Sequence, residues 1–195
     1  RIAPDNSRVT LDEVKITPEE IRGLKKIFIT ACGTAYHAGF VGKYVIEKIA
    51  RLPVEVDIAS EFRYRNPIIE PGTLVIIISQ SGETADTLAA LREARRQGAY
   101  VIAVTNVVGS SVSREADDVI YTLAGPEIAV ASTKAYTTQL ASMYLIALHL
   151  ATVRGTIAPG ELGRILAEMK KLDAKAQLLV DNLDEIRDFA NKISS

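Results

Sequence analysis

The chain has 195 residues, 48% hydrophobic and 24% charged, a composition typical of a globular protein and not of a disordered, collagen-like or low-complexity one. Its 23 basic and 24 acidic side chains give a net charge of −1, so a broad electrostatic attraction to nucleic acid or to an anionic membrane is excluded. The length predicts one compact domain with an appendage.

The cysteine content and the apolar segments bear on the compartment. Cys32 is the one cysteine of the sequence, so no internal disulfide can form and no zinc-binding spacing exists. The amino terminus has no apolar signal core, and the longest apolar segment, Leu140–Ala151, is too short to span a bilayer. We therefore expect a cytoplasmic protein. Because the chain begins at Arg1, we also expect a piece of a longer protein.

Apolar runs of strand length alternate with stretches of helical period from the first strand onward. Strands are predicted at Lys26–Ala31, Val54–Ile58, Leu74–Ile78, Tyr100–Thr105 and Val119–Leu123. Helices are predicted from about Tyr36 to Ala50, Thr84 to Arg96 and Ser110 to Glu115, and a further one opens near Lys134. The run Leu74–Ile78 is apolar at every position, which is typical of a strand buried on both faces.

Strands joined by helical crossovers predict the α/β class, with a doubly wound, five-stranded parallel sheet of flavodoxin-like order. Three segments follow from the pattern: a lead-in over residues 1–24, a sheet domain over residues 25–154 and a helical segment over residues 155–195. In the last segment apolar residues recur at spacings of three and four from Leu162 to Ile193. Asp181-Asn182 followed by Glu185 resembles a capping box, so we expect two helices broken near Asn182.

In an open sheet of this order, ligands bind beyond the carboxyl ends of strands one and three, where the winding reverses. The first of these ends continues into Cys32-Gly33-Thr34-Ala35, and the third into Ser79-Gln80-Ser81-Gly82-Glu83-Thr84. Hydroxyl groups and a glycine at the amino terminus of a helix suit a phosphate, because unpaired N–H groups point at the ligand. Serine and threonine are also common helix caps, so a purely structural role stays open.

A third loop, Val130-Ala131-Ser132-Thr133-Lys134, opens the helix that carries Tyr136 and Gln139, and it could reach the same crevice. Ser132 could instead cap that helix. Neither a G-x-G-x-x-G motif nor a P-loop is present, so we expect no nucleotide cofactor. A phosphoacceptor receiver domain is excluded, because it needs carboxylates where this chain has Ala31-Cys32 and Ser79-Gln80.

Candidate catalytic side chains are scarce. His37 lies one turn into the first predicted helix near the crevice, whereas His149 sits in an apolar helix where packing is the simpler interpretation. Cys32 could be a thiolate, but it lacks a recognisable base. For Ser60–Arg65, which contains Glu61, Arg63 and Arg65, we expect ordinary surface ion pairs.

Four segments together resemble a known family. They are Cys32-Gly33-Thr34, Ala59–Arg65, Ser79–Thr87 and Val130–Ala135. They are similar to the first sugar isomerase (SIS) lobe of the glutamine–fructose-6-phosphate aminotransferases, and the resemblance covers nearly the whole chain. It implies an enzyme that combines ammonia from glutamine with fructose 6-phosphate and isomerises the product to glucosamine 6-phosphate, at the start of amino-sugar synthesis.

The resemblance also implies site residues, partners and an inactive fragment. The substrate-binding residues would be Thr34, Ala35, Ser79, Gln80, Ser81, Thr84, Val130 and Ser132. The catalytic groups would lie in a second SIS lobe, and the glutaminase nucleophile in an amino-terminal domain, so we expect no catalytic residue, metal or cofactor here. The family usually pairs, which predicts a homodimer.

One position departs from the family pattern, and one alternative function remains. Ala35 stands where the family usually has a serine that contacts the ligand. The alternative is a non-catalytic sugar-phosphate sensor built on the same lobe, as in some transcription regulators. A helix-turn-helix in the parent chain would favour the sensor, and a catalytic second lobe would favour the enzyme.

Overall fold

The computed structural model describes residues 1–11 and 13–194. Its strands are β1 (Lys26–Ala31), β2 (Val54–Ile58), β3 (Thr73–Ser79), β4 (Tyr100–Thr105) and β5 (Asp118–Tyr121). Its helices are α1 (Pro18–Gly23), α2 (Gly33–Ile49), α3 (Ala59–Tyr64), α4 (Ala85–Arg96), α5 (Ser111–Glu115), α6 (Lys134–Arg154), α7 (Pro159–Met169), α8 (Leu172–Asp181) and α9 (Asp184–Ile193). The order of strands and helices through β5 confirms the predicted alternation.

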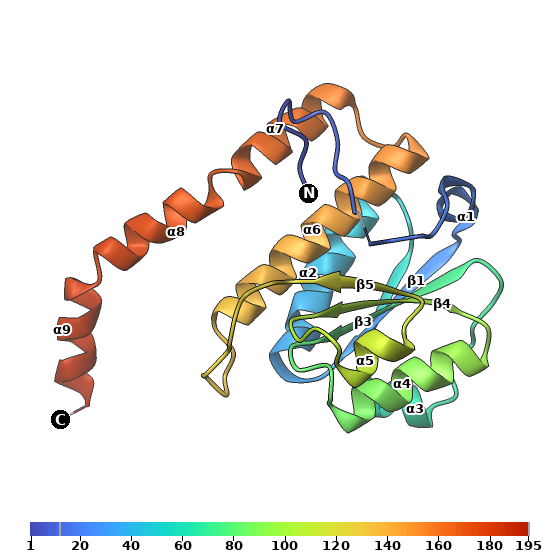
Figure 1. The fold of residues 1–195 in the computed structure, drawn as a ribbon, viewed down its shortest axis with the longest axis horizontal. Coiled ribbons are helices and arrows are strands. Elements are labelled where there is room, and N and C mark those ends of the chain that lie inside the picture. The colour runs from blue at the N-terminus through green and yellow to red at the C-terminus, as the bar shows by residue number, and fades with distance from the viewer. Residues whose placement is uncertain (12, 195) are drawn as a thin grey trace.

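The strands form one parallel sheet in the order β2-β1-β3-β4-β5, which confirms the predicted class. Helices cover both faces of this sheet (Figure 1). On one face Ile29, Ile76 and Ile102 pack in a core with residues of α2 and α6, and on the other Phe28 and Ile77 pack with residues of α3, α4 and α5. Successive residues of a strand are therefore buried on opposite faces of the sheet, which explains why apolar residues occupy consecutive positions in the strands.

Helices α2 and α6 approach closely at Gly42. A Cβ atom on Gly42 would lie 2.8 Å from Met143 Sδ and 3.2 Å from Ile29 Cδ1, so a larger residue there would force these side chains to shift. Figure 1 shows the two helices side by side over the sheet. This layer carries two of the loops that reach the carboxyl edge of the sheet.

Local predictions were incomplete or wrong at four points. Helix α2 begins at Gly33 instead of Tyr36, and the short helices α1 and α3 were not predicted. The expected break near Asn182 exists, but the predicted cap does not form there, because Leu183 is the N-cap of α9 and makes no side-chain cap bond. The helical segment also breaks a second time, between Met169 and Leu172, so the described residues after 158 form three helices instead of two.

The ends of the chain differ in how they pack. Ile21 and Leu24 of the lead-in lie in the same core as β1, and Leu162 and Leu166 of α7 pack with Val9 and Leu148. No side chain of α8 or α9 is buried, and Figure 1 shows both helices leading away from the sheet. The division into residues 1–24, 25–154 and 155–195 stays a prediction.

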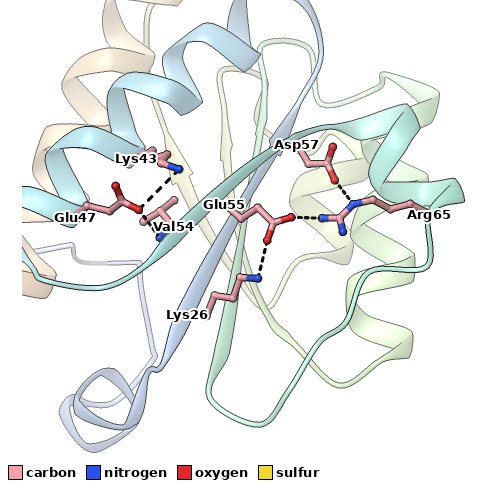
Figure 2. A network of polar contacts seen from close by, with 7 residues as sticks. All are labelled: Lys26, Lys43, Glu47, Val54, Glu55, Asp57 and Arg65. Atoms are coloured by element: carbon pink, nitrogen blue, oxygen red, sulfur yellow. Dashed lines mark hydrogen bonds and ion pairs between the residues drawn. The ribbon is translucent and has the colours of Figure 1, made fainter.

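The outer strand β2 carries a network of charged side chains. Figure 2 shows Arg65 reaching both Glu55 and Asp57, while Lys26 Nζ lies 2.6 Å from Glu55 Oε2. The expected surface pairing of Arg65 is thus confirmed, and Arg63 NH1 pairs with Asp86 Oδ1 at 3.4 Å. Burial works against ionisation of both groups, but the ion pairs outweigh it. The carboxylates of Asp57 and Glu55 raise the pKa of the Arg65 guanidinium. The cations Lys26 and Arg65 lower the pKa of the Glu55 carboxyl.

Candidate functional site

One cavity of about 380 Å³ lies at the carboxyl ends of β1 and β3, a size suited to a small ligand. The described residues that line it are Cys32, Gly33, Thr34, Ala35, Ile78, Ser79, Gln80, Ser81, Thr84, Thr87, Glu127, Ala129, Val130, Ser132 and Gln139. All eight residues predicted to bind substrate are among them. The sheet order therefore brings together three loops that lie far apart in the sequence.

The loop between β3 and α4 is organised by its own hydroxyl groups. Ser79 Oγ accepts a hydrogen bond from the backbone N–H of Gly82 at 3.0 Å and lies 3.5 Å from Thr84 Oγ1. Ser81 Oγ accepts from the N–H of Glu83 at 3.2 Å. Thr84 is the N-cap of α4, yet its side chain makes no hydrogen bond to the backbone of that helix. The Thr84 hydroxyl therefore does not cap the helix, although serine and threonine often do so at this position.

Gly82 is required by the shape of this loop. Its φ of +67° lies in the left-handed region that favours glycine, and an added Cβ would lie 2.2 Å from Ser110 Oγ and 2.9 Å from Thr105 Oγ1. Its carbonyl oxygen accepts a hydrogen bond from Val112 N at 3.0 Å. The loop is therefore pressed against the segment that follows β4, which fixes its position at the cavity.

The loop between β1 and α2 supplies a second helix amino terminus. Cys32 is the N-cap of α2 without a side-chain cap bond, and Gly33 and Thr34, the first residues of that helix, line the cavity. Ala35 is buried, at 7% exposure. Thr87 Oγ1 donates to Cys32 Sγ at 3.9 Å, which ties α4 to this loop. Two helix amino termini thus face one cavity, an arrangement that favours an anion.

The third loop is held by Glu127. Its Oε2 accepts hydrogen bonds from the backbone N–H of Thr133 at 2.9 Å and of Ala135 at 3.0 Å, and its Oε1 accepts from Ala129 N at 3.3 Å. These backbone donors lower the pKa of Glu127 to about 2. The first turn of α6 is thus occupied by a carboxylate of the protein itself.

Val130 and Ser132 lie beyond this anchor. Val130 is fully exposed at the mouth of the cavity, whereas Ser132 Oγ is buried and has no hydrogen-bond partner. Ser132 has a φ of +42°, uncommon for a residue with a side chain. The N-cap of α6 is Thr133, so the alternative that Ser132 caps this helix is wrong.

The other candidate catalytic residues lie outside the cavity lining. His37 is exposed and its ring packs edge-on against Tyr36, with centroids 5.8 Å apart. His149 is half-buried, with Nδ1 3.4 Å from the carbonyl oxygen of Val9, and burial lowers its pKa. Within the described part of the chain, no cluster of His, Cys, Asp or Glu could hold a metal ion, and no helix has the length and apolar character to cross a membrane.

Sequence reasoning did not assign Glu127, Ile78, Thr87 or Gln139 to the site, although all four line the cavity. Glu127 is one of 24 acidic residues and has no distinguishing motif around it. Gln139 was predicted only to lie on the helix that follows the third loop. Gln139 lies within α6, whereas Ser132 lies in the loop before it with a φ of +42°, so no helical spacing relates the two residues in the sequence.

Comparisons with known proteins agree with this geometry. The model of the SIS domain family matches residues 20–149. The chain is 63% identical over 188 residues to glutamine–fructose-6-phosphate aminotransferase (isomerizing) of Caldanaerobacter subterraneus subsp. tengcongensis. It is 61% identical over 184 residues to the protein of that name from Clostridium tetani. These matches cover 96% and 94% of this chain, but only 31% and 30% of the relatives.

A solved structure is similar over the same region. The C-terminal domain of glucosamine-fructose-6-phosphate aminotransferase from Francisella tularensis matches with a TM-score of 0.84 and 40% identity, over 94% of this chain and 52% of that chain. The family match includes all five strands, helices α2 and α4, and α6 as far as residue 149. This chain therefore belongs to the SIS domain family.

Proposed function

We propose that this chain is the first SIS lobe of a glutamine–fructose-6-phosphate aminotransferase, and that its cavity binds the substrate fructose 6-phosphate or the product glucosamine 6-phosphate. The observation that carries the proposal is the gathering of Thr34, Ser79, Ser81 and Thr84 around one cavity beside two helix amino termini. High identity to curated aminotransferases disfavours the alternative of a sensor domain in a regulator.

The phosphate is proposed to bind between the amino termini of α2 and α4. Hydroxyl groups and backbone N–H groups are good partners for phosphate oxygens, and the partial positive charge at both helix ends favours the anion. The corresponding end of α6 is already neutralised by Glu127. The phosphate is therefore directed to the side of the cavity formed by Ser79–Thr84.

The chain alone is proposed to bind the sugar without converting it. Among the described lining residues, Cys32 and Glu127 have titratable side chains. Glu127 is held as a carboxylate by backbone donors with a pKa of about 2, so it is a poor proton donor or acceptor near neutral pH. The acid–base and amine chemistry is proposed to come from a second SIS lobe, and the ammonia from a glutaminase domain of the parent protein.

We further propose a cytoplasmic homodimer. Support for pairing comes from α8 and α9, whose apolar side chains are exposed and would be covered by another surface. These exposed residues are Leu172, Leu178, Leu179, Val180, Ile186, Phe189 and Ile193, and Leu183 between the two helices is exposed as well. Sedimentation at micromolar concentration should give a dimer, and a monomer would contradict this part of the proposal.

Calorimetric titration of the 195-residue chain with fructose 6-phosphate tests the binding proposal. Thr84→Ala should weaken binding about tenfold or more, because a hydrogen bond to a charged group contributes roughly 1.5–3 kcal/mol. Ser113→Ala is the control, since Ser113 Oγ donates to the carbonyl oxygen of Ser110 outside the cavity lining. Equal affinity of the Thr84 variant and the wild type would remove this loop from the phosphate site.

A further inference from the structure

Gln139 is a buried polar residue whose hydrogen bonding is incomplete. It lies on α6, lines the cavity and is 2% exposed, yet its side-chain Oε1 has no hydrogen-bond partner. Buried polar atoms are paired in the great majority of cases, because an unpaired one costs free energy. A neighbouring residue in the helix, Ser142, follows the common rule, since its Oγ donates to Thr138 O at 2.9 Å.

The fold places Gln139 across the cavity from the proposed phosphate site. Helix α6 packs on the face of the sheet covered by α2, whereas α4 covers the opposite face (Figure 1). Thr84 at the start of α4 and Gln139 therefore reach the cavity from opposite sides of the end of β3. A ligand whose phosphate binds at Ser79–Thr84 extends its carbon chain toward α6.

The chemistry of the α6 side suits hydroxyl groups and not a second phosphate. Glu127 places a carboxylate at this end of α6, so a phosphate group there would meet like charge. Ser132, on the same side, also has a buried Oγ without a partner. Sugar hydroxyls both donate and accept hydrogen bonds, and a glutamine amide and a serine hydroxyl can pair with either role.

We propose that Gln139 is a specificity-determining residue, whose side-chain amide hydrogen-bonds a hydroxyl of the sugar phosphate at the end remote from the phosphate. The inference rests on the proposed function, because it requires a sugar phosphate in this cavity. It assigns to Gln139 the recognition of the polyol chain and leaves the recognition of phosphate to Ser79–Thr84.

The test compares Gln139→Met with the wild type in calorimetric titrations of the full 195-residue chain. Methionine keeps the length and flexibility of glutamine and removes its hydrogen-bonding groups. Gln139→Met should lower the affinity for fructose 6-phosphate about tenfold while inorganic phosphate, measured as a competitor, binds as it does to the wild type. Ser142→Ala is the matched control, and it should leave the affinity unchanged because its hydroxyl is paired within the helix.

Thermal unfolding without ligand separates recognition from a structural role. Removing an unpaired buried polar group should leave the unfolding temperature of Gln139→Met equal to that of the wild type or above it. A lowered unfolding temperature, in parallel with weaker binding of both sugar phosphate and inorganic phosphate, would overturn the inference in favour of structural support.

Two further outcomes distinguish the inference from the proposed function. If Gln139→Met binds fructose 6-phosphate as tightly as the wild type while Thr84→Ala weakens it, Gln139 has no part in recognition and the sugar-phosphate site stands. If the wild type itself does not bind fructose 6-phosphate, the proposed function fails and the role of Gln139 fails with it.

Discussion

Glu127 Oε2 accepts a hydrogen bond at 3.0 Å from the backbone N–H of Ala135, eight residues further along the chain. This contact joins the loop after β5 to the first turn of α6, where the partial positive charge of the helix would otherwise attract an anion. Glu127 therefore has two effects on the cavity. It holds the loop that contains Val130 and Ser132, and its carboxylate occupies the amino terminus of α6, one of the three helix ends (α2, α4 and α6) that favour an anion.

Glu127→Gln should weaken fructose 6-phosphate binding several-fold without unfolding the sheet. The neutral amide has one acceptor oxygen, and its NH₂ group would face backbone N–H groups that now donate to the carboxylate. Calorimetry for affinity and circular dichroism for the fold would check this. Glu168→Gln is the control, since the lysines Lys171 and Lys175 lower the pKa of Glu168 to about 2 outside the cavity. A Glu127 variant that binds like the Glu168 variant would contradict the prediction.

The stabilisation provided by Glu127 should depend on pH. The pKa of its carboxyl is about 2 in the fold and 4.5 in a free side chain, so the ionised form is favoured by folding. This contribution is fully present above about pH 4.5 and is lost as the pH falls toward 2. The difference in unfolding temperature between the wild type and Glu127→Gln should therefore shrink across this interval. A difference that stays constant down to pH 2 would show that the charge of Glu127 is unimportant.

Gly82→Ala should destabilise the chain and disrupt the cavity. The left-handed backbone costs a residue with a Cβ about 1–2 kcal/mol, and the clash with Ser110 adds to this. The unfolding temperature should fall by at least about 4 °C. Gly98→Ala provides the control, because Gly98 has a φ of +87° but nothing within 4 Å of an added Cβ. The prediction is wrong if the two variants lose equal stability.

Ala35→Ser should tighten sugar-phosphate binding by about 1 kcal/mol, or roughly fivefold. Ala35 lines the cavity in the first turn of α2, where a hydroxyl group would add a hydrogen bond to the ligand. Titration with fructose 6-phosphate measures the gain. If Ala35→Ser has no effect while Ser81→Ala still weakens binding, the ligand does not approach the loop of Thr34.

The sheet could be predicted from the sequence because its strands are short and apolar. Leu74–Ile78 has no polar residue, and such a run has few options other than a central strand. The strand order then brought the loops after β1 and β3 to one place. Local patterns were less informative at α3, which has six residues, and at Lys170-Lys171, where the helix breaks without glycine or proline.

The unpredicted part of the site depends on contacts between distant side chains and backbone. Glu127 looks like any surface carboxylate in the sequence, and its role comes from the path that the loop takes back to Ala135. The unpaired state of Gln139 is likewise a property of the packed cavity. Neither property has a local spacing that a sequence pattern could reveal.

The charged network on β2 affects how copies of this chain can meet. An exposed outer strand is a template for strand addition and aggregation, and charged side chains discourage such pairing. Here Glu47 Oε1 accepts the backbone N–H of Val54 at 3.0 Å, and Glu55, Asp57 and Arg65 surround the rest of the strand with mutually neutralised charge. Association by extending one sheet into another is therefore disfavoured at this edge, which leaves the exposed apolar side chains of α8 and α9 as the contact surface of the proposed homodimer.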